Sequence, residues 1–101
     1  MIYFTQLIYL HDGQEKIYHQ FEDKVLPLLS KYHGKLLLRL RPDEGTFIDV
    51  NMDKPYEIHL VAFESEQDFL NYSGDEERRQ FMPLKDQSVR KSILIRGLAL
   101  P

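Results

Sequence analysis

Glu57 and His59 are the residues of this 101-residue chain whose types and spacing best suit chemistry. They stand two positions apart in PYEIHLVAF, a run that alternates as a β-strand does, so their side chains share one face. An unperturbed imidazole titrates near neutral pH, and a neighbouring carboxylate can orient it as a general base. The alternative is a half-buried histidine bonded to a neighbour or across a dimer interface, and both interpretations stay open.

Three arginines, Arg39, Arg41 and Arg96, are expected on the same face of the sheet as His59. A cavity bounded by that face would be locally positive and could hold a carboxylate or phosphate, to which Arg39 and Arg96 would bind from either flank. The alternative is an ion-pair network between subunits, with Glu57 or with acids of residues 42–54. Arg41, at the end of its strand, is the one best placed to be solvated only.

Tyr3, Thr5 and Tyr9 also belong to this face, and their hydroxyls could orient a ligand. The alternative is ordinary cross-strand packing, which is the commoner role of aromatic and β-branched residues. The chain has no cysteine and no glycine-rich phosphate loop, and His11, His19 and His33 lack metal-ligand spacing. We therefore expect neither a metal nor a cofactor.

Hydrophobic periodicity predicts the elements that must position these side chains. Pro27 is expected to kink or divide the first helix, because it lacks an N–H group and its ring crowds the preceding turn. Asp75 and Pro83 each predict the start of a further short helix. In order, we expect a strand at 2–10, a helix at 12–32, strands at 35–41 and 56–63, a helix at 65–72 and a strand at 92–96.

This β-α-β-β-α-β order predicts an α+β fold, the ferredoxin-like sandwich. Two right-handed crossovers place both helices on one face of a four-stranded antiparallel sheet, in which the third strand is central and neighbours the first. We expect the uniformly apolar set to lie under the helices: Ile2, Phe4, Ile8, Leu36, Leu38, Leu40, Ile58, Leu60, Ile93 and Ile95. The opposite face would then carry Tyr3, Thr5, Leu7, Tyr9, Leu37, Arg39, Arg41, Glu57, His59, Val61, Phe63, Leu94 and Arg96.

That opposite face is half apolar and aromatic, which is too much to leave in water on a monomer. We therefore predict a homodimer that covers it. The connection at residues 42–54 is longer than an ordinary hairpin loop, and Ile48, Val50 and Met52 alternate within it. We expect a short extra strand, or an arm ordered by the sheet edge or by a partner chain.

Composition sets the remaining bounds. A chain of 101 residues predicts one domain over residues 1–101, and 43% hydrophobic content is typical of globular proteins. A net charge of −3, with no run of basic residues, argues against nucleic-acid binding. The apolar N-terminal run covers only about ten residues, too few to cross a bilayer, so no membrane association is expected. Lack of cysteine suits a reducing compartment, and we predict a cytoplasmic protein.

The run PYEIHLVAFESEQDFLNY, the split βαβ order and the PLL-K-Y-x-G end of the first helix resemble the dimeric α/β-barrel superfamily. Within it, the chain is most similar to a small family of about this length catalogued as a domain of unknown function. The resemblance implies that two sheets pair face to face into a barrel. The superfamily includes cofactor-free monooxygenases, haem-degrading enzymes, lactone isomerases and ligand-sensing domains, so it leaves the chemistry open. No catalytic motif of those enzymes can be carried over to a position here.

Two functional hypotheses follow from the sequence. In the first, a homodimer holds a small acidic or aromatic molecule between its sheets, with Glu57 and His59 supporting cofactor-free oxygenase or isomerase-like chemistry. The ligand-binding residues would be Arg39, Arg96, Tyr3, Thr5 and Tyr9. In the second, the protein is a non-catalytic ligand-sensing or dimerisation domain, and paired polar groups on that face would favour it.

Overall fold

The structure is a computed structural model that describes residues 1–101. Its elements follow the predicted order, with the second helical region divided into three short helices. They are β1 (Ile2–Leu10), α1 (Glu15–Val25), the 3-10 helix η1 (Leu26–Tyr32), β2 (Gly34–Leu40), the 3-10 turn η2 (Glu44–Thr46), β3 (Glu57–Phe63), α2 (Glu66–Ser73), α3 (Glu76–Gln80), α4 (Met82–Ser88) and β4 (Val89–Gly97).

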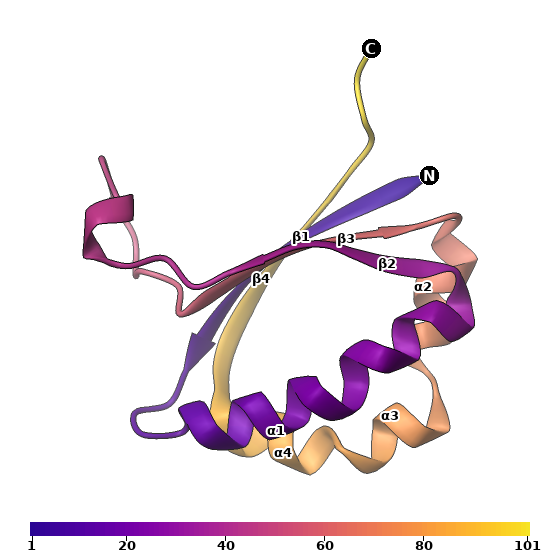
Figure 1. Ribbon diagram of the computed structural model, residues 1–101, viewed down its shortest axis with the longest axis horizontal. Helices are drawn as coiled ribbons and strands as arrows, with labels where there is room; N and C mark the ends of the chain where they lie inside the picture. The colour runs from indigo at the N-terminus through magenta and orange to yellow at the C-terminus, as the bar shows by residue number, and fades with distance from the viewer.

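The four strands form one antiparallel sheet in the order β2-β3-β1-β4, so β3 is internal and pairs with β1 as predicted. Every main helix lies on the same face of this sheet, and the opposite face has no second layer (Figure 1). The ferredoxin-like α+β fold is therefore confirmed. None of the helices combines the length and the apolar character that crossing a bilayer would need.

Local sequence explains where the helices begin and end. Pro27 divides the first helical region as predicted: α1 ends at Val25, and the tighter η1 continues with the proline in its first turn. The Ser65 side chain caps α2 by accepting from the Asp68 N–H at 3.1 Å. Asp75 caps α3 in the same way through the Arg78 N–H at 2.8 Å.

Gly34 begins β2 where the backbone passes close to the core. A Cβ atom at this position would lie 2.7 Å from Cε1 of the Phe63 ring and 3.0 Å from the Leu29 carbonyl oxygen. The preceding residue, His33, takes the left-handed conformation (φ 57°) in which a glycine more often ends a helix. Gly34 is thus required for close packing, and the turn itself is made by a histidine.

The prediction of which strand faces lie under the helices is correct for β1 and wrong for β3. Ile2, Phe4 and Ile8 of β1 are buried beneath the helices as expected. Register pairs Phe4 with Val61, Gln6 with His59 and Ile8 with Glu57, so the polar side of β3 shares the helix-covered face. Ile58 and Leu60 consequently face the uncovered side, contrary to the prediction.

A bulge in β2 explains part of the error. Leu36 pairs with Val61 and Leu38 pairs with Leu60, so Leu37 is an extra residue that shifts the strand by one. After the bulge, Leu38 and Leu40 face the uncovered side, while Arg39 turns toward the helices. In β4, pairing with β1 places Ser92, Leu94 and Arg96 under the helices and Ile93 and Ile95 on the uncovered side.

The uncovered face, which we call the open face, is more apolar than the sequence predicted. Its central part carries Thr5, Leu7, Leu38, Leu40, Ile58, Leu60, Ile93 and Ile95. Leu38 and Ile95 are 48% and 54% exposed, which is high for large apolar residues in a sheet. A patch of this kind on one side of a sheet is typical of a surface that binds another protein chain.

The segment between β2 and β3 forms an arm that projects beyond the sheet (Figure 1). It contains the turn η2 and no strand, so the prediction of a short extra strand is wrong. Ile48 is 94% exposed and Met52 51% exposed, so the expected buried side of the arm is absent within one chain. Its ordering by a partner chain stays a prediction.

Candidate functional site

The Glu57 carboxylate is the centre of a buried polar cluster on the helix-covered face of β3. It accepts hydrogen bonds from the Tyr18 hydroxyl of α1, from Nε2 of His59 at 2.5 Å and from Nε of Arg41 at 2.7 Å. Nε of Arg39 lies 3.1 Å from Oε2 of Glu57 and forms an ion pair without hydrogen-bond alignment. One carboxylate thus joins α1, β2 and β3.

These donors decide the charge of Glu57. Burial by itself would raise the pKa of this carboxyl, but hydrogen bonds from His59, Tyr18 and Arg41 and the close Arg39 guanidinium lower it from 4.5 to about 2. Tyr18 changes in the opposite direction, because burial, with the charge of Glu22 and the bond to Glu57 adding to it, raises the pKa of its phenol well above 10. At neutral pH Glu57 is ionised and Tyr18 keeps its proton.

The ionised state of Glu57 fixes the tautomer of His59. A carboxylate only accepts hydrogen bonds, so Nε2 of His59 must be the donor in the bond between them. Nδ1 makes no hydrogen bond within the chain, and the ring is 2% exposed. A neutral His59 therefore carries its basic lone pair on Nδ1, in the arrangement by which a carboxylate orients a catalytic histidine.

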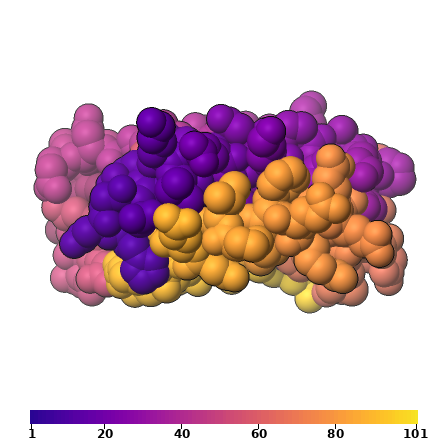
Figure 2. Space-filling model, turned by 90° about the horizontal axis from the view of Figure 1, so that it is seen from below, coloured from indigo at the N-terminus to yellow at the C-terminus, as the bar shows by residue number.

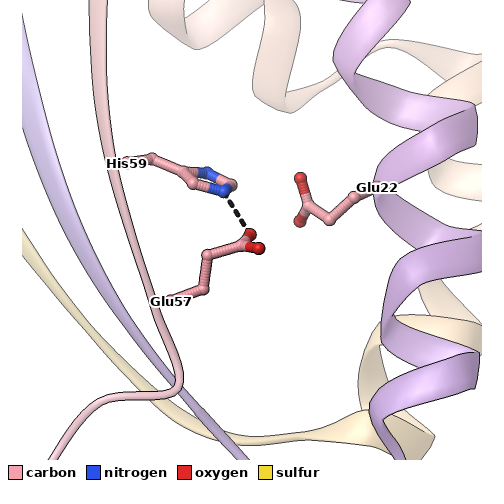
Figure 3. Close-up of side chains that lie close together, drawn as sticks. All are labelled: Glu22, Glu57 and His59. Atoms are coloured by element: carbon pink, nitrogen blue, oxygen red, sulfur yellow. Dashed lines mark hydrogen bonds and ion pairs between the residues drawn. The ribbon is translucent and has the colours of Figure 1, made fainter. Parts of the chain in front are cut away.

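Glu22 faces this pair from α1, and its carboxyl points toward His59 and Glu57 (Figure 3). It is buried, yet it makes no hydrogen bond or ion pair in the protein. Burial raises the pKa of this carboxyl, and the charge of Glu57 adds to the effect while His59 opposes it. A buried acid without a hydrogen-bond partner destabilises the fold and is rare in proteins. Such a residue, held in its protonated form, is typical of a functional site.

Glu22 and His59 line a cavity of about 320 Å³ between the helices and the sheet. The size falls within the range of small-molecule sites in proteins, roughly 300–1,000 Å³. Twelve of its nineteen lining residues are hydrophobic, and they include the stacked rings of Phe4 and Phe69, whose centroids are 4.1 Å apart. The other seven are Gln6, Glu22, His59, Ser73, Arg78, Lys85 and Ser92.

The cavity lies under the helix layer, where α1 and the α3–α4 segment lie side by side (Figure 2). Its walls come from every strand except β2 and from every main helix, so the complete fold is needed to form it. The sequence predicted a pocket between two sheets on the other face. That location is wrong, because His59 faces α1.

Ligand atoms of Glu22, Glu57 and His59 lie within 4.8 Å of one another, close enough to converge on one metal ion. The neighbouring guanidinium groups of Arg39 and Arg41 oppose this, since both pair with Glu57 and would repel a second cation. The donor set therefore fits proton transfer better than metal binding.

The structure does not bring the predicted anion-binding residues together. Arg39 pairs with Glu57, and Arg96 pairs with Glu66 of α2 at 3.1 Å on the surface. Arg41 also pairs with Glu57 and is not merely solvated. The anion clamp of Arg39 and Arg96 is wrong. Arg39 and Arg41 pair with Glu57, as the alternative named it, but within one chain, and an ion-pair network between subunits stays a prediction.

Tyr3, Thr5 and Tyr9 face the open side of β1, away from the cavity, and do not line it. Tyr9 is buried there, donates its hydroxyl to the Asp53 carbonyl at 2.9 Å and lies under the Lys91 ammonium at 4.6 Å. Its contacts fasten the arm to the sheet. A ligand role for these three residues is not supported by their positions.

Sequence reasoning missed Tyr18 and Glu22, together with Arg78 and Lys85, which also line the cavity. A signal for the first pair was present. Tyr18 and Glu22 are four residues apart beside the apolar stripe of the helix, where they flank Phe21. Arg78 and Lys85 lie in short polar helices whose orientation no periodicity indicated.

Comparison with known proteins supports the fold. No protein-family model and no curated protein matches the sequence. Among solved structures, a protein of unknown function from Rhodopseudomonas palustris matches with a TM-score of 0.83 and 17% identity, covering 99% of this chain and 82% of the other. A DABB family protein with a ferredoxin-like fold from Mesorhizobium loti matches with a TM-score of 0.68 and 17% identity, covering 99% and 97%.

A dimeric protein of unknown function with a ferredoxin-like fold, from Bacteroides fragilis, matches with a TM-score of 0.70 and 11% identity, covering 95% of this chain and 93% of the other. At such identities the likeness shows the fold alone. It confirms the predicted resemblance to ferredoxin-like proteins of unknown function, at least one of them a dimer.

Proposed function

We propose that this protein binds a small molecule in the cavity between α1 and the sheet and transfers a proton within it, using His59 as base and no cofactor. One observation carries the proposal: the unpartnered carboxyl of Glu22 faces the His59–Glu57 pair inside a largely apolar cavity (Figure 3). A proton acceptor and a carboxylic acid that face one bound molecule are the requirement for general acid–base catalysis.

The roles follow from the geometry. Nδ1 of His59 takes a proton from a carbon next to a carbonyl group, and protonated Glu22 gives its proton to the carbonyl oxygen. The product is the enol, and return of a proton to another position completes an isomerisation with both side chains restored. Glu57 is a positioning residue, because it fixes the His59 ring through Nε2 and stabilises the imidazolium that forms.

Phenylpyruvate is a suitable probe, since it combines an aromatic ring, a carbonyl group and exchangeable protons on the adjacent carbon. Exchange of those protons in deuterated buffer is followed by NMR with the full chain. We expect the protein to accelerate exchange over buffer, and His59→Gln to reduce the acceleration about 100-fold or more. Glu22→Gln should lower the rate while leaving probe binding unchanged.

His11→Gln is the matched control, because His11 is an exposed histidine outside the cavity. This variant should accelerate proton exchange of the probe to the same extent as the wild type. Exchange that is unaffected by His59→Gln, in a variant that folds normally, would contradict the proposal.

The second candidate function is ligand binding without turnover, as in a sensing domain. The paired network of Glu57 with Tyr18, Arg39 and Arg41 favours it, because mutually satisfied polar groups suit a structural role. Saturable binding of phenylpyruvate with no exchange above buffer would support this candidate.

A further inference from the structure

Two cationic side chains in the wall of the cavity are not matched by an ion pair. Arg78 of α3 and Lys85 of α4 both line it, and neither forms an ion pair in the structure. Nε of Arg78 is buried and makes no hydrogen bond. Its Nη1 atom makes only long contacts, 3.4 Å to the Ser73 carbonyl oxygen and 3.6 Å to Sδ of Met82.

The position of Arg78 is nevertheless well defined. Its guanidinium lies over the Tyr72 ring at 5.0 Å from the centroid, an arrangement that holds the planar group in place without consuming its donors. Ser73, which also lines the cavity, directly precedes the turn into α3. A held guanidinium with unused N–H donors is prepared to bind a carboxylate in a bidentate manner.

The charges around the cavity also favour an anionic ligand. Glu57, the one strongly ionised acid of the region, is already matched by Arg39 and Arg41. Glu22 is the remaining acid, and burial favours its neutral form. Burial and the charge of Arg78 lower the pKa of Lys85, and the charges of Asp86 and Glu22 oppose this only in part.

We propose that Arg78 and Lys85 bind the anionic group of a small aromatic or alicyclic acid, whose apolar body packs against the Phe4, Phe63 and Phe69 side of the cavity. This inference rests on the proposed function, for which it names the substrate class. The acid would be anchored by these two side chains, with the rest of its body within reach of His59 and Glu22, which line the same cavity. A buried cation without a partner is destabilising, and an anionic ligand would remove this destabilisation. The cavity should therefore bind an anionic ligand more tightly than a neutral one of the same shape.

The test compares two probes of the same shape, 1-naphthoate and its neutral analogue 1-naphthamide, by isothermal titration calorimetry on the full chain. We expect the wild type to bind naphthoate at least about tenfold more tightly than naphthamide. Arg78→Met and Lys85→Met should each weaken naphthoate binding about tenfold to hundredfold and leave naphthamide binding unchanged, because methionine retains the apolar stem without the charge.

Arg79→Met is the matched control, since Arg79 is the adjacent exposed arginine of α3 and does not line the cavity. It should bind both probes as the wild type does. Two separate variants keep the test valid if circular dichroism shows that one of them does not fold. Equal affinity for the two probes, unchanged in both variants, would overturn the inference and leave binding in the cavity intact. Failure of the wild type to bind either probe would overturn the inference and remove the support for a binding cavity as well.

Discussion

At the scale of single residues, Glu57 is a fully buried carboxylate that pairs with Arg39, Arg41 and His59. Its pKa in the folded state, about 2, lies below the ordinary value of 4.5. A carboxyl with a depressed pKa stabilises the fold above its unfolded pKa, and this stability is lost as the pH falls from about 4.5 toward 2. The difference corresponds to stabilisation on the order of 3 kcal/mol at neutral pH.

We predict that Glu57→Gln lowers the free energy of unfolding at pH 7 by about 3–5 kcal/mol, because it leaves Arg39 and Arg41 without their anion. The difference from the wild type should narrow steadily between pH 4.5 and pH 2. Urea unfolding at a series of pH values measures it. Glu15→Gln, at an exposed acid in the first turn of α1, is the control and should change the free energy of unfolding little at any pH. A loss of stability in Glu57→Gln that stays the same from pH 7 to pH 2 would contradict the assigned charge state.

Glu22 should behave in the opposite way. Burial raises its pKa, so the folded state prefers the protonated carboxyl, and stability falls as the pH rises above the unfolded value. We predict that Glu22→Gln raises the melting temperature at pH 8 and leaves it unchanged at pH 4. Thermal unfolding at the two pH values checks this. A loss of stability at pH 8 would mean that ionised Glu22 is stabilised by a contact with the cations of the cavity.

At the scale of elements, the start of β2 depends on the absence of a side chain at Gly34. A methyl group there would meet the Phe63 ring and the Leu29 carbonyl, both inside the packed core. We predict that Gly34→Ala lowers the free energy of unfolding by about 1–3 kcal/mol, measured by urea unfolding. Gly97→Ala is the control in β4, where no heavy atom lies within 4 Å of the added Cβ; equal effects of the two substitutions would exclude this packing explanation.

The sequence predicts the helices and strands themselves better than it predicts which face of each strand lies under the helices. Alternation in β1, the caps at Ser65 and Asp75 and the break at Pro27 are local signals, and the structure has the elements that they predict. The faces of β3 were assigned by the rule that apolar residues lie under helices. That rule fails where both faces are apolar and the covered one holds the buried polar cluster around Glu57.

The bulge at Leu37 was a second obstacle. An inserted residue leaves the alternation of LLLRLR unchanged in appearance while it reverses the face of each later side chain. For the candidate site, the sequence identified His59 and Glu57 as neighbours, which the structure confirms, because both lie on one strand. Glu22 comes from 35 residues earlier, and only the packing of α1 on β3 brings it to them.

At the scale of the whole molecule, the open face is the surface through which we expect the chain to dimerise. The Cα radius of gyration is 14.0 Å, somewhat above the roughly 13 Å of a compact domain of this length, and only 17 of 101 residues are buried. A second copy placed on the open face would complete that burial, and one structural neighbour is described as dimeric. Each large apolar side chain that becomes buried contributes roughly 1.5–3 kcal/mol.

We therefore predict a dimer at micromolar concentration and a tenfold or greater loss of dimer affinity in Leu38→Lys, since a lysine on the open face would bury a charge. Sedimentation velocity at several concentrations measures it. Leu70→Lys is the matched control, because Leu70 is similarly exposed, at 53%, but lies on α2, on the other side of the sheet. A wild type that remains monomeric and folded at high concentration would exclude this assembly.

The arm provides an independent test of the same assembly. Ile48, Val50 and Met52 are exposed in one chain, so any protection of this segment must come from a partner. We predict that amide exchange between residues 46 and 53 is slow in the dimer and accelerates on dilution or in Leu38→Lys. Fast exchange at all concentrations would place the arm outside the interface.

The cavity and the open face lie on opposite sides of one sheet, and this has a consequence for stoichiometry. Two chains joined through their open faces would carry their cavities on the outside, separated by both sheets. The strand residues that line the cavity lie on the helix-covered face, so a partner on the open face would add nothing to the wall of either cavity. Coupling between sites requires that binding at one alter the other, and no shared wall provides it. Each dimer is then expected to take up two ligand molecules independently, with a Hill coefficient of about 1.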